Sequence, residues 1–226
     1  MNTLYLDKTQ TSKAADILKN GGTVAIPTET VYGLAANTFD EEAVKNIFKA
    51  KGRPSDNPLI VHISKISDIY DVVSEFPEKA KKLADKFWPG PLTMILPKNK
   101  NIPYCVTCGM DSVAVRFPSH KIAREIIEKS GVPLVAPSAN ISGRPSPTKF
   151  EHVVNDLSGK IDAMLDGGDC TVGVESTVLS LVNTVPVVLR PGLITQKEIS
   201  DVIGEVEISP FVMKAPKIGE EVLSPG

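Results

Sequence analysis

The chain has 226 residues, of which 42% are hydrophobic and 23% are charged, and its formal net charge is −2. These values are typical of a soluble globular protein with one main domain, and the near-neutral charge argues against a dedicated nucleic-acid-binding domain, which is normally basic. No apolar run approaches the roughly 18 residues that a membrane span requires, and no signal pattern opens the chain, so we expect a cytoplasmic protein without membrane contact.

The first predicted helix begins at Thr11 or Ser12, either of which has the side chain of an N-cap, and a strand over residues 23–26 follows it. This strand leads into the segment PTETVYG, in which hydroxyl groups cluster where the strand ends. Hydroxyls in that position are well placed to bind a ligand. Thr28 alone could simply cap the turn. The clustering of several such side chains, Thr30 among them, is better explained by ligand binding.

A second helix is predicted from the N-cap Asp40 to a stop at Gly52, so that Lys51 and Arg53 leave the helix end together. Two prolines then hold the chain extended up to a strand that carries His62. An arginine fork contacts two phosphate oxygens at once and a lysine adds a point charge, so this pair suits a polyphosphate. For Lys51 alone, a solvated cation that complements the helix dipole is an equal alternative. For His62 the alternative is a buried structural histidine.

The middle of the chain begins with a lysine-rich amphipathic helix over residues 77–87, and the tryptophan that follows it, Trp88, is expected in the core. The strand DSVAVR ends on a charge, Arg116, before a helix that is predicted over residues 119–129. A guanidinium at a strand end is a good clamp for a carboxylate.

A loop rich in small hydrogen-bond donors follows. A predicted strand over residues 133–136 runs into Ser138, Asn140 and Ser146, and a helix over residues 149–157 comes next. Loops of this composition present main-chain and hydroxyl groups to a ligand. We therefore expect this loop to contact a bound molecule.

In the last part of the chain, polar side chains again lie next to the ends of predicted strands. The segment GVEST brings Ser176 to the start of a strand, and Arg190 ends the next strand before a proline and a glycine. Thr195 and Glu198 form a capping box, which predicts a final helix that ends near Ile203.

One order recurs along the chain: a strand, then proline or glycine, then a polar side chain. It is found at Thr30, His62, Arg116, Ser138, Ser176 and Arg190. The ends of strands in one sheet can converge, so these side chains are expected to meet. Helices between strands predict an α/β fold, and the hairpin-like VNTVPVV between two late strands predicts a mixed sheet rather than a doubly wound parallel one.

The standard nucleotide and metal motifs are missing from the sequence. It has no P-loop, no Rossmann glycine motif, no zincin motif and no nucleophile elbow. Cys105 and Cys108 form a single C-x-x-C without a second ligand pair, so we predict no metal held by the protein. An odd number of cysteines, three, fits a reducing compartment.

Seven segments, in order, resemble the signature segments of the threonylcarbamoyl-adenylate synthase family, whose catalytic unit is the YrdC-type domain. They read PTETVYGLA, KGRPSDNPLIVH, FWPGPLT, VAVRFP, APSANISGRPSPT, GVESTVLSL and LRPG, and they span about residues 10–203. The resemblance implies a twisted α/β sheet of mixed parallel and antiparallel strands, with a concave active-site face, over residues 1–204. Residues 205–226 would then be an extended tail or the start of an interdomain linker.

The resemblance also implies an enzyme that converts L-threonine, bicarbonate and ATP into threonylcarbamoyl-AMP and pyrophosphate. This is the first step towards N6-threonylcarbamoyladenosine at position 37 of tRNAs. Mg²⁺ would arrive with ATP. A separate downstream enzyme would transfer the threonylcarbamoyl group, so tRNA would be an indirect partner.

The match assigns roles to individual positions. It implies that threonine is bound by Thr30, His62, Arg116, Ser176 and the main chain at Ala136. It implies that ATP is bound by Arg53, Asn57, Ser112, Ser138, Asn140, Ser146 and Arg190, with Lys51 and Arg53 as the catalytic cations. In this scheme Arg116 pairs with the carboxylate of the amino acid. No residue acts as a covalent nucleophile, because the enzyme contributes positioning and electrostatics.

Two other functions remain open from the sequence. One is an RNA-binding module without adenylation activity, which a salt-dependent affinity for tRNA without ATP consumption would identify. The other is carbamoyl-adenylate chemistry on a different acceptor, as in hydrogenase-maturation proteins, which carry additional zinc-finger and acylphosphatase-like regions that are not seen here. We also expect the chain to be either a truncated version of a long-form enzyme or a natural short form. A version extended beyond Gly226 should make the adenylate faster, or lose less of it to hydrolysis.

Overall fold

The computed structural model describes residues 2–213. Its strands are β1 (Leu4–Leu6), β2 (Val24–Ile26), β3 (Gly33–Asn37), β4 (Ile60–His62), β5 (Leu92–Pro97), β6 (Ser112–Arg116), β7 (Leu134–Val135), β8 (Ala163–Leu165), β9 (Thr177–Ser180), β10 (Val187–Arg190) and β11 (Glu207–Ile208). Its helices are α1 (Thr11–Lys19), α2 (Glu41–Lys51), the short 3₁₀ helix η1 (Ile66–Asp68), α3 (Ile69–Val72), α4 (Glu78–Phe87), α5 (Tyr104–Thr107), α6 (Lys121–Ser130), α7 (Phe150–Leu157), α8 (Gln196–Ile203) and α9 (Pro210–Met213).

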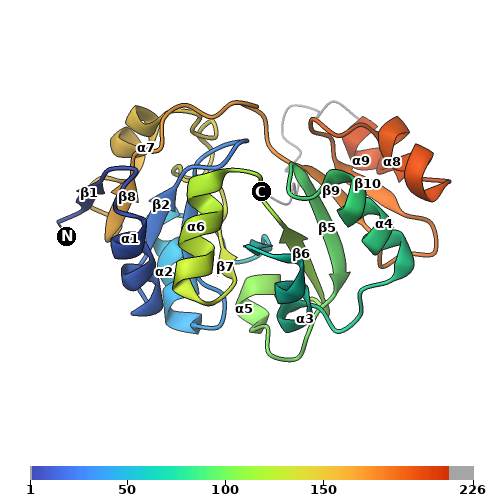
Figure 1. Ribbon diagram of the computed structural model, residues 1–226, viewed down its shortest axis with the longest axis horizontal. Coiled ribbons are helices and arrows are strands. Elements are labelled where there is room, and N and C mark those ends of the chain that lie inside the picture. Colours follow the sequence, from blue (N-terminus) through green and yellow to red (C-terminus); the bar gives the residue numbers. More distant parts are fainter. Residues whose placement is uncertain (1, 214–226) are drawn as a thin grey trace.

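The described strands form one sheet of eleven, in the order β1-β8-β2-β3-β7-β4-β6-β5-β9-β10-β11. Strand β1 lies at one end of the molecule and β10 near the other (Figure 1). The sheet is mixed, because β4 pairs with β6 and β5 with β9 in parallel, whereas β2 pairs with β3 and β5 with β6 in antiparallel fashion. The predicted mixed α/β fold is confirmed. The predicted hairpin is also confirmed, since β9 and β10 are antiparallel neighbours.

Helices pack on both faces of the sheet. Neighbouring side chains of a strand point to opposite faces, so on β2 Ala25 enters the larger core while Val24 and Ile26 enter a smaller one. The larger core contains buried side chains of α2, α4, α7 and α8, and the smaller one is formed with α1 and α6, which lie side by side (Figure 1). Strands β4, β5, β6 and β9 contribute none of their described residues to the smaller core. Helices α1 and α6 therefore do not pack on that face of these four strands.

Helix α2 begins and ends as its sequence predicts. The Asp40 side chain accepts hydrogen bonds from the main-chain N–H groups of Glu42 and Ala43, at 3.0 and 3.1 Å. Gly52 ends the helix with φ at +60°, a left-handed conformation that glycine adopts without steric cost. The capping box of α8 is confirmed as well.

The predicted start of the first helix is wrong. Gln10 is the N-cap residue of α1, no side chain caps this helix, and Thr11 already lies inside it. The Thr11 hydroxyl instead donates to Glu125 of α6 at 2.7 Å, so its tertiary contact with the neighbouring helix takes the place of the cap. Strand β1, at the edge of the sheet, was not predicted.

The sheet continues beyond residue 204, where the sequence predicts that the catalytic domain ends. Strand β11 pairs in parallel with β10, and Val206 is buried in the larger core. The rest of the predicted tail, residues 214–226, lies outside the described residues. Among the described helices, none has the length and apolar character needed to cross a membrane.

Candidate ligand-binding site

The polar side chains that the sequence places after strands do converge. One pocket lies on the face of β4, β5, β6 and β9 on which α1 and α6 do not pack. It is lined by Thr30, His62, Arg116, Ala136, Ser138, Glu175, Ser176 and Arg190, among others. All six positions of the recurring pattern are in this set, which confirms the predicted convergence. The pocket is small, with a volume of about 30 Å³.

Strand pairing brings these residues together. His62 and Arg116 end the parallel strands β4 and β6 and are register partners. Thr93 of β5 is the partner of Arg116 on its other side, and its hydroxyl lies 2.8 Å from that of Ser176, which precedes β9. Register partners point to the same face of a sheet, so all four side chains project from one face.

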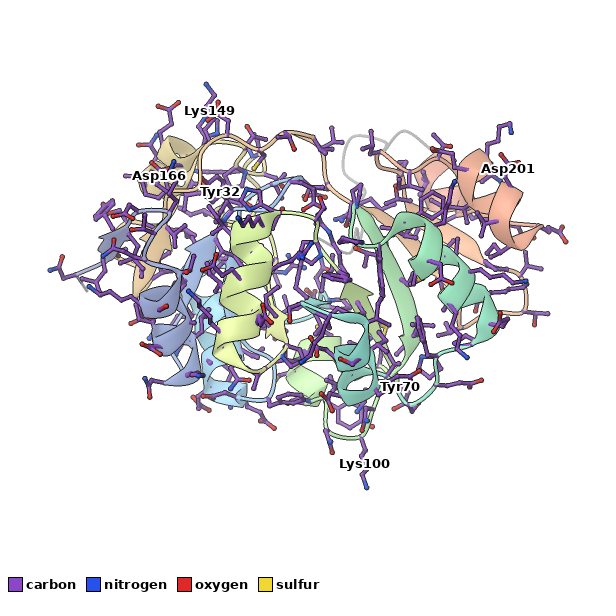
Figure 2. The ribbon with its side chains drawn as sticks, viewed as in Figure 1. Tyr32, Tyr70, Lys100, Lys149, Asp166 and Asp201 are labelled. Carbon is purple, nitrogen blue, oxygen red and sulfur yellow. The ribbon has the colours of Figure 1, made fainter. Side chains whose placement is uncertain are left out.

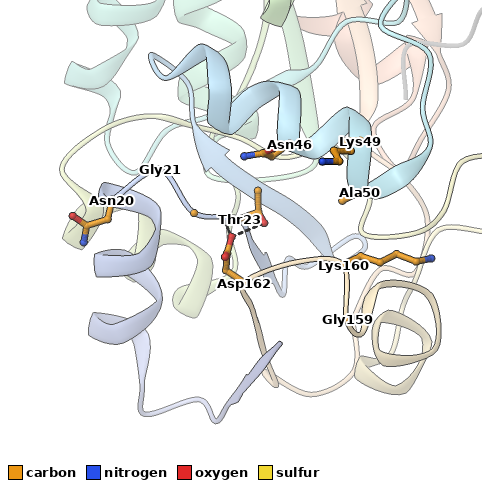
Figure 3. A pocket seen from close by; sticks show the side chains of 10 residues that line it. Asn20, Gly21, Thr23, Asn46, Lys49, Ala50, Gly159, Lys160 and Asp162 are labelled. Atoms are coloured by element: carbon orange, nitrogen blue, oxygen red, sulfur yellow. Dashed lines mark hydrogen bonds between the residues drawn. The ribbon is translucent and has the colours of Figure 1, made fainter. Parts of the chain in front are cut away.

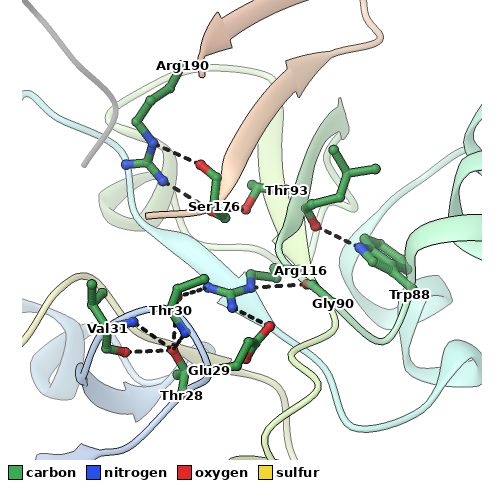
Figure 4. A network of polar contacts seen from close by, with 11 residues as sticks. Thr28, Glu29, Thr30, Val31, Trp88, Gly90, Thr93, Arg116, Ser176 and Arg190 are labelled. Atoms are coloured by element: carbon green, nitrogen blue, oxygen red, sulfur yellow. Dashed lines mark hydrogen bonds and ion pairs between the residues drawn. The ribbon is translucent and has the colours of Figure 1, made fainter. Parts of the chain in front are cut away.

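Arg116 lies at the centre of a buried polar network (Figure 4). Its Nη1 donates to the Thr30 hydroxyl at 2.9 Å, and its Nε donates to the Gly90 carbonyl at 3.4 Å. Its Nη2 lies 2.6 Å from Oε1 of Glu29, a close ion pair whose alignment is poor for a hydrogen bond. The clamp predicted for a ligand carboxylate thus already holds a carboxylate of its own chain.

Glu29 was not predicted as a site residue. Burial acts to raise the pKa of its carboxyl group, but the adjacent positive charge of Arg116 outweighs burial and lowers the pKa. Glu29 is therefore ionised at neutral pH and fixes the guanidinium. Its position within PTETVYG, beside the hydroxyls, was the only signal in the sequence.

His62 is buried, with 3% of its surface exposed, and its Nδ1 lies 3.1 Å from the carbonyl oxygen of Ile60. A carbonyl can only accept, so Nδ1 carries the proton and Nε2 is left as an acceptor. Burial, and after it the charge of Arg116, lowers the pKa of His62 to about 3. The ring is therefore neutral at physiological pH, as an acceptor for a ligand hydroxyl or amine requires.

This pKa predicts acid sensitivity. Between pH 6.5 and about 3 the unfolded chain binds a proton that folded His62 does not, so stability falls as the pH drops through this window. The contribution is at most about 1.4 kcal/mol per pH unit. Urea unfolding at pH 7 and pH 5 should show a smaller loss in His62→Gln than in the wild type. Substitution of the exposed His152 should leave the loss unchanged, and equal losses in all three proteins would contradict the prediction.

The second guanidinium, Arg190, is also held by its own chain. Its Nε donates to the Ser176 carbonyl and its Nη2 to the Ser176 hydroxyl, both at 3.1 Å. Its Nη1 lies 2.6 Å from Oε2 of Glu175, whose Oε1 accepts from the Ser146 hydroxyl at 2.6 Å. Glu175, like Glu29, was not predicted as a site residue.

Lys51 is buried, with 2% of its surface exposed, which excludes the solvated helix end. Its Nζ donates to the carbonyls of Ser138 and, at 2.8 Å, Asn140, and its own carbonyl accepts from Ser142 N at 2.9 Å. Burial, and after it the charge of Arg53, lowers the pKa of Lys51 to about 7. Lys51 thus links the end of α2 to the loop that carries Ser138 and Asn140, and it does not line the pocket.

The remaining predicted ATP residues lie towards the other end of β4 and β6. The Arg53 Nη2 donates to the carbonyls of Asn57 and Pro58, at 3.2 and 3.4 Å, just before β4. Ser112 starts β6, so it lies about 13 Å from Arg116, which ends the same strand. Ile60 is the register partner of Ala114, and this pairing places the start of β6 beside the start of β4. The predicted residues therefore form two groups along one face, which suits a ligand set with two parts.

Backbone hydrogen bonds join the segment PTETVYG to the loop that follows β7 and carries Ser138, Asn140 and Ser146. Tyr32 N donates to the Pro147 carbonyl and Tyr32 O accepts from Ala139 N, both at 2.8 Å. The buried Tyr32 hydroxyl donates to the Gly168 carbonyl at 2.7 Å, near Asp166 (Figure 2). Burial raises the Tyr32 pKa, so this hydroxyl keeps its proton and serves the structure.

A roomier hollow, of about 540 Å³, lies at the opposite end of β2 (Figure 3). It is lined by the backbone around Gly21, by Asn46 and Lys49 of α2, and by Asp162. The Asp162 carboxylate is already engaged by the N–H and the hydroxyl of Thr23, at 2.8 and 3.1 Å. No predicted ligand residue lines this hollow, whereas seven line the smaller pocket, which is therefore the candidate site. Within residues 2–213, no three His, Cys, Asp or Glu side chains are grouped to hold a metal ion.

Several known proteins are similar to this chain. A family model named Sua5_yciO_yrdC and described as "Telomere recombination" matches residues 16–192. The threonylcarbamoyl-AMP synthase of Pyrococcus abyssi is 55% identical over 199 residues, covering 88% of this chain and 58% of the relative. That of Bacillus subtilis is 51% identical over 218 residues, covering 96% and 62%. This chain thus spans about three fifths of the length of these curated relatives. A crystal structure of P. abyssi Sua5 complexed with L-threonine superposes with a TM-score of 0.93 at 48% identity, covering 100% of this chain and 67% of that one.

Proposed function

Because the chain belongs to the Sua5/YciO/YrdC family, we propose that it is an enzyme that makes threonylcarbamoyl-AMP and pyrophosphate from L-threonine, bicarbonate and ATP. The observation that carries this proposal is a single pocket lined by two guanidiniums, each of which holds a hydroxyl: Arg116 donates to Thr30, and Arg190 donates to Ser176. The names of the two curated relatives support it, as does the L-threonine bound by the solved relative.

Threonine would bind at the ends of β4 and β6. Its carboxylate would share the Arg116 guanidinium with Glu29, which holds the fork in place. The neutral His62 would accept a hydrogen bond at Nε2 from the threonine amine or hydroxyl. Thr30 and Ser176 would complete the orientation of the amino acid. The amine attacks only when it is unprotonated, and His62, whose pKa is lowered to about 3, would orient the amine without removing its proton.

The chemistry needs no covalent nucleophile. The threonine nitrogen attacks the carbon of bicarbonate, a C–N bond forms, and water leaves to give the carbamate. A carbamate oxygen then attacks the α-phosphorus of ATP, an O–P bond forms, and pyrophosphate departs with the electrons of the broken P–O bond. Both steps gain from fixed positions and from cations near the phosphates.

ATP would lie along the donor-rich loop. Ser138, Asn140 and Ser146 would offer hydroxyl, amide and main-chain groups, and Arg53 and Arg190 would offset charge at the phosphates. Mg²⁺ would enter with the triphosphate as part of this substrate. A separate enzyme in the cytoplasm would then transfer the threonylcarbamoyl group to tRNA.

Pyrophosphate release tests this function directly. The chain is incubated with ATP, bicarbonate and labelled L-threonine, and each component is left out in turn. We expect release that requires all three components and a labelled product that carries AMP. Release that continues without threonine or bicarbonate would contradict the proposal, and salt-dependent tRNA binding without ATP consumption would favour an RNA-binding module instead.

A further inference from the structure

One carboxylate, that of Glu175, lies among the groups expected to bind phosphate. Its two oxygens contact Arg190 Nη1 and the Ser146 hydroxyl, each at 2.6 Å. The Arg190 side chain is 11% exposed and that of Glu175 is 31% exposed. Both partners of Glu175 are thus residues that the family resemblance assigns to ATP.

The charge of Glu175 also reaches the other two cations. Burial lowers the pKa of Lys51 and of Arg53, and the charge of Glu175 acts in the opposite direction on both. Lys51 and Arg53 disfavour each other's charge, and so do Arg53 and Arg190. A negative charge at the position of Glu175 therefore compensates all three cations.

The contacts of Glu175 are those that a phosphate group would make. A guanidinium N–H on one oxygen and a hydroxyl on the other is a common way to recognise either a carboxylate or a phosphate. A serine hydroxyl has one proton to donate, so Ser146 cannot donate to Glu175 and to a phosphate at once. Glu175 also lines the candidate pocket, together with Arg190.

The backbone around Glu175 leaves it room to move. It lies just before β9, and its neighbour Val174 is 51% exposed. Gly173 has φ at +73°, and no atom lies within 4 Å of the position that a Cβ would take there. A rotation of the Glu175 side chain towards solvent would thus break its two polar contacts without opening the core.

We propose that Glu175 occupies the phosphate subsite of the empty protein as an internal counterion, and that it leaves Arg190 and Ser146 when a polyphosphate binds. This inference rests on the proposed function. The carboxylate lets three cations lie close together before the ligand arrives. It also competes with the ligand, so it weakens polyphosphate binding and speeds release.

Calorimetric titration with inorganic tripolyphosphate, in EDTA, tests this role. Glu175→Gln keeps the shape of the side chain and removes its charge, and we expect it to lower the Kd by about tenfold. Glu175→Asp keeps the charge but shortens the reach, and should give a smaller decrease. The matched control is Asp169→Asn, which removes the same charge from a side chain that is 71% exposed and lies 3.9 Å from Lys149. It should leave the Kd unchanged.

The other outcomes separate the alternatives. An unchanged or higher Kd in Glu175→Gln would overturn the inference and make Glu175 an anchor that holds Arg190 for the ligand. Weaker binding of the variant only when Mg²⁺ is added would make Glu175 a metal ligand, which also overturns it. If the wild type releases pyrophosphate normally, either result leaves the proposed function intact. If neither the wild type nor any variant binds tripolyphosphate or ATP, the phosphate subsite and the proposed function fall together.

Discussion

Arg116→Ala should abolish threonine-dependent pyrophosphate release and lower the free energy of unfolding by about 3–5 kcal/mol. The two side chains of the Arg116–Glu29 pair are 5% and 7% exposed, so the substitution leaves a carboxylate buried without its cation. It also removes the donor to Thr30 and the charge expected to hold the amino acid. Calorimetry with L-threonine and with ATP, together with urea unfolding, measures these effects. Threonine affinity should fall much more than ATP affinity.

A second substitution separates the fold from the ligand. In Glu29→Gln/Arg116→Ala the buried carboxylate becomes a neutral amide, so most of the lost stability should return. Threonine binding should stay absent, because the guanidinium is still missing. Lys82→Ala, which removes an exposed cation on α4, serves as the control and should change neither property. If the double variant binds threonine as the wild type does, Arg116 serves the fold and not the substrate.

Lys51→Ala should lower ATP affinity at least about tenfold while threonine affinity stays within about twofold. The substitution removes the ammonium group that donates to the carbonyls of Ser138 and Asn140, at the centre of the expected ATP loop. The Ser138 carbonyl keeps the main-chain N–H of Asn140 as a donor, at 3.0 Å, but a buried carbonyl left without a donor costs about 1–3 kcal/mol, so loss of the contact with the Asn140 carbonyl should also make the protein less stable. Titration with both ligands and denaturant unfolding give these quantities.

Two further variants test whether the ammonium group of Lys51 is itself responsible for the loss of ATP affinity. Lys51→Met fills the same space without donating, so it should lose ATP affinity as the alanine variant does but leave a smaller cavity. Lys49→Ala removes a like charge from an exposed position two residues earlier on α2 and should have no effect. Unchanged ATP affinity in both Lys51 variants would show that this ammonium does not hold the loop for the nucleotide.

The sequence was enough to predict where the site lies, but not how its charges are paired. A polar residue after a buried strand can be recognised locally, and Thr30, His62, Arg116, Ser138, Ser176 and Arg190 were found in this way. The partners of the two arginines were missed because a pairing such as that of Arg116 with Glu29 depends on which strands are neighbours in the sheet. No local pattern encodes that order.

Two other failures have the same origin. Thr11 has the side chain of an N-cap, but a contact with α6, more than a hundred residues later, claims its hydroxyl. Lys51 was predicted to be a cation at the phosphates, with a solvated helix end as the alternative, yet the folded loop buries it and supplies two carbonyl acceptors. Local propensity predicts the elements well, and tertiary contacts decide what their end residues do.

The order of strands in the sheet also sets when the site can exist during synthesis. Leu4 of β1 pairs with Ala163 of β8, and β4 pairs with β6 and β7, which both follow it in the chain. At about 5–20 residues per second, β1 waits roughly 10–30 s on the ribosome before its partner has been made. The arginine that ends β10 emerges later still. The pocket therefore becomes complete only once residue 190 has been made, when the strands that precede it are already available.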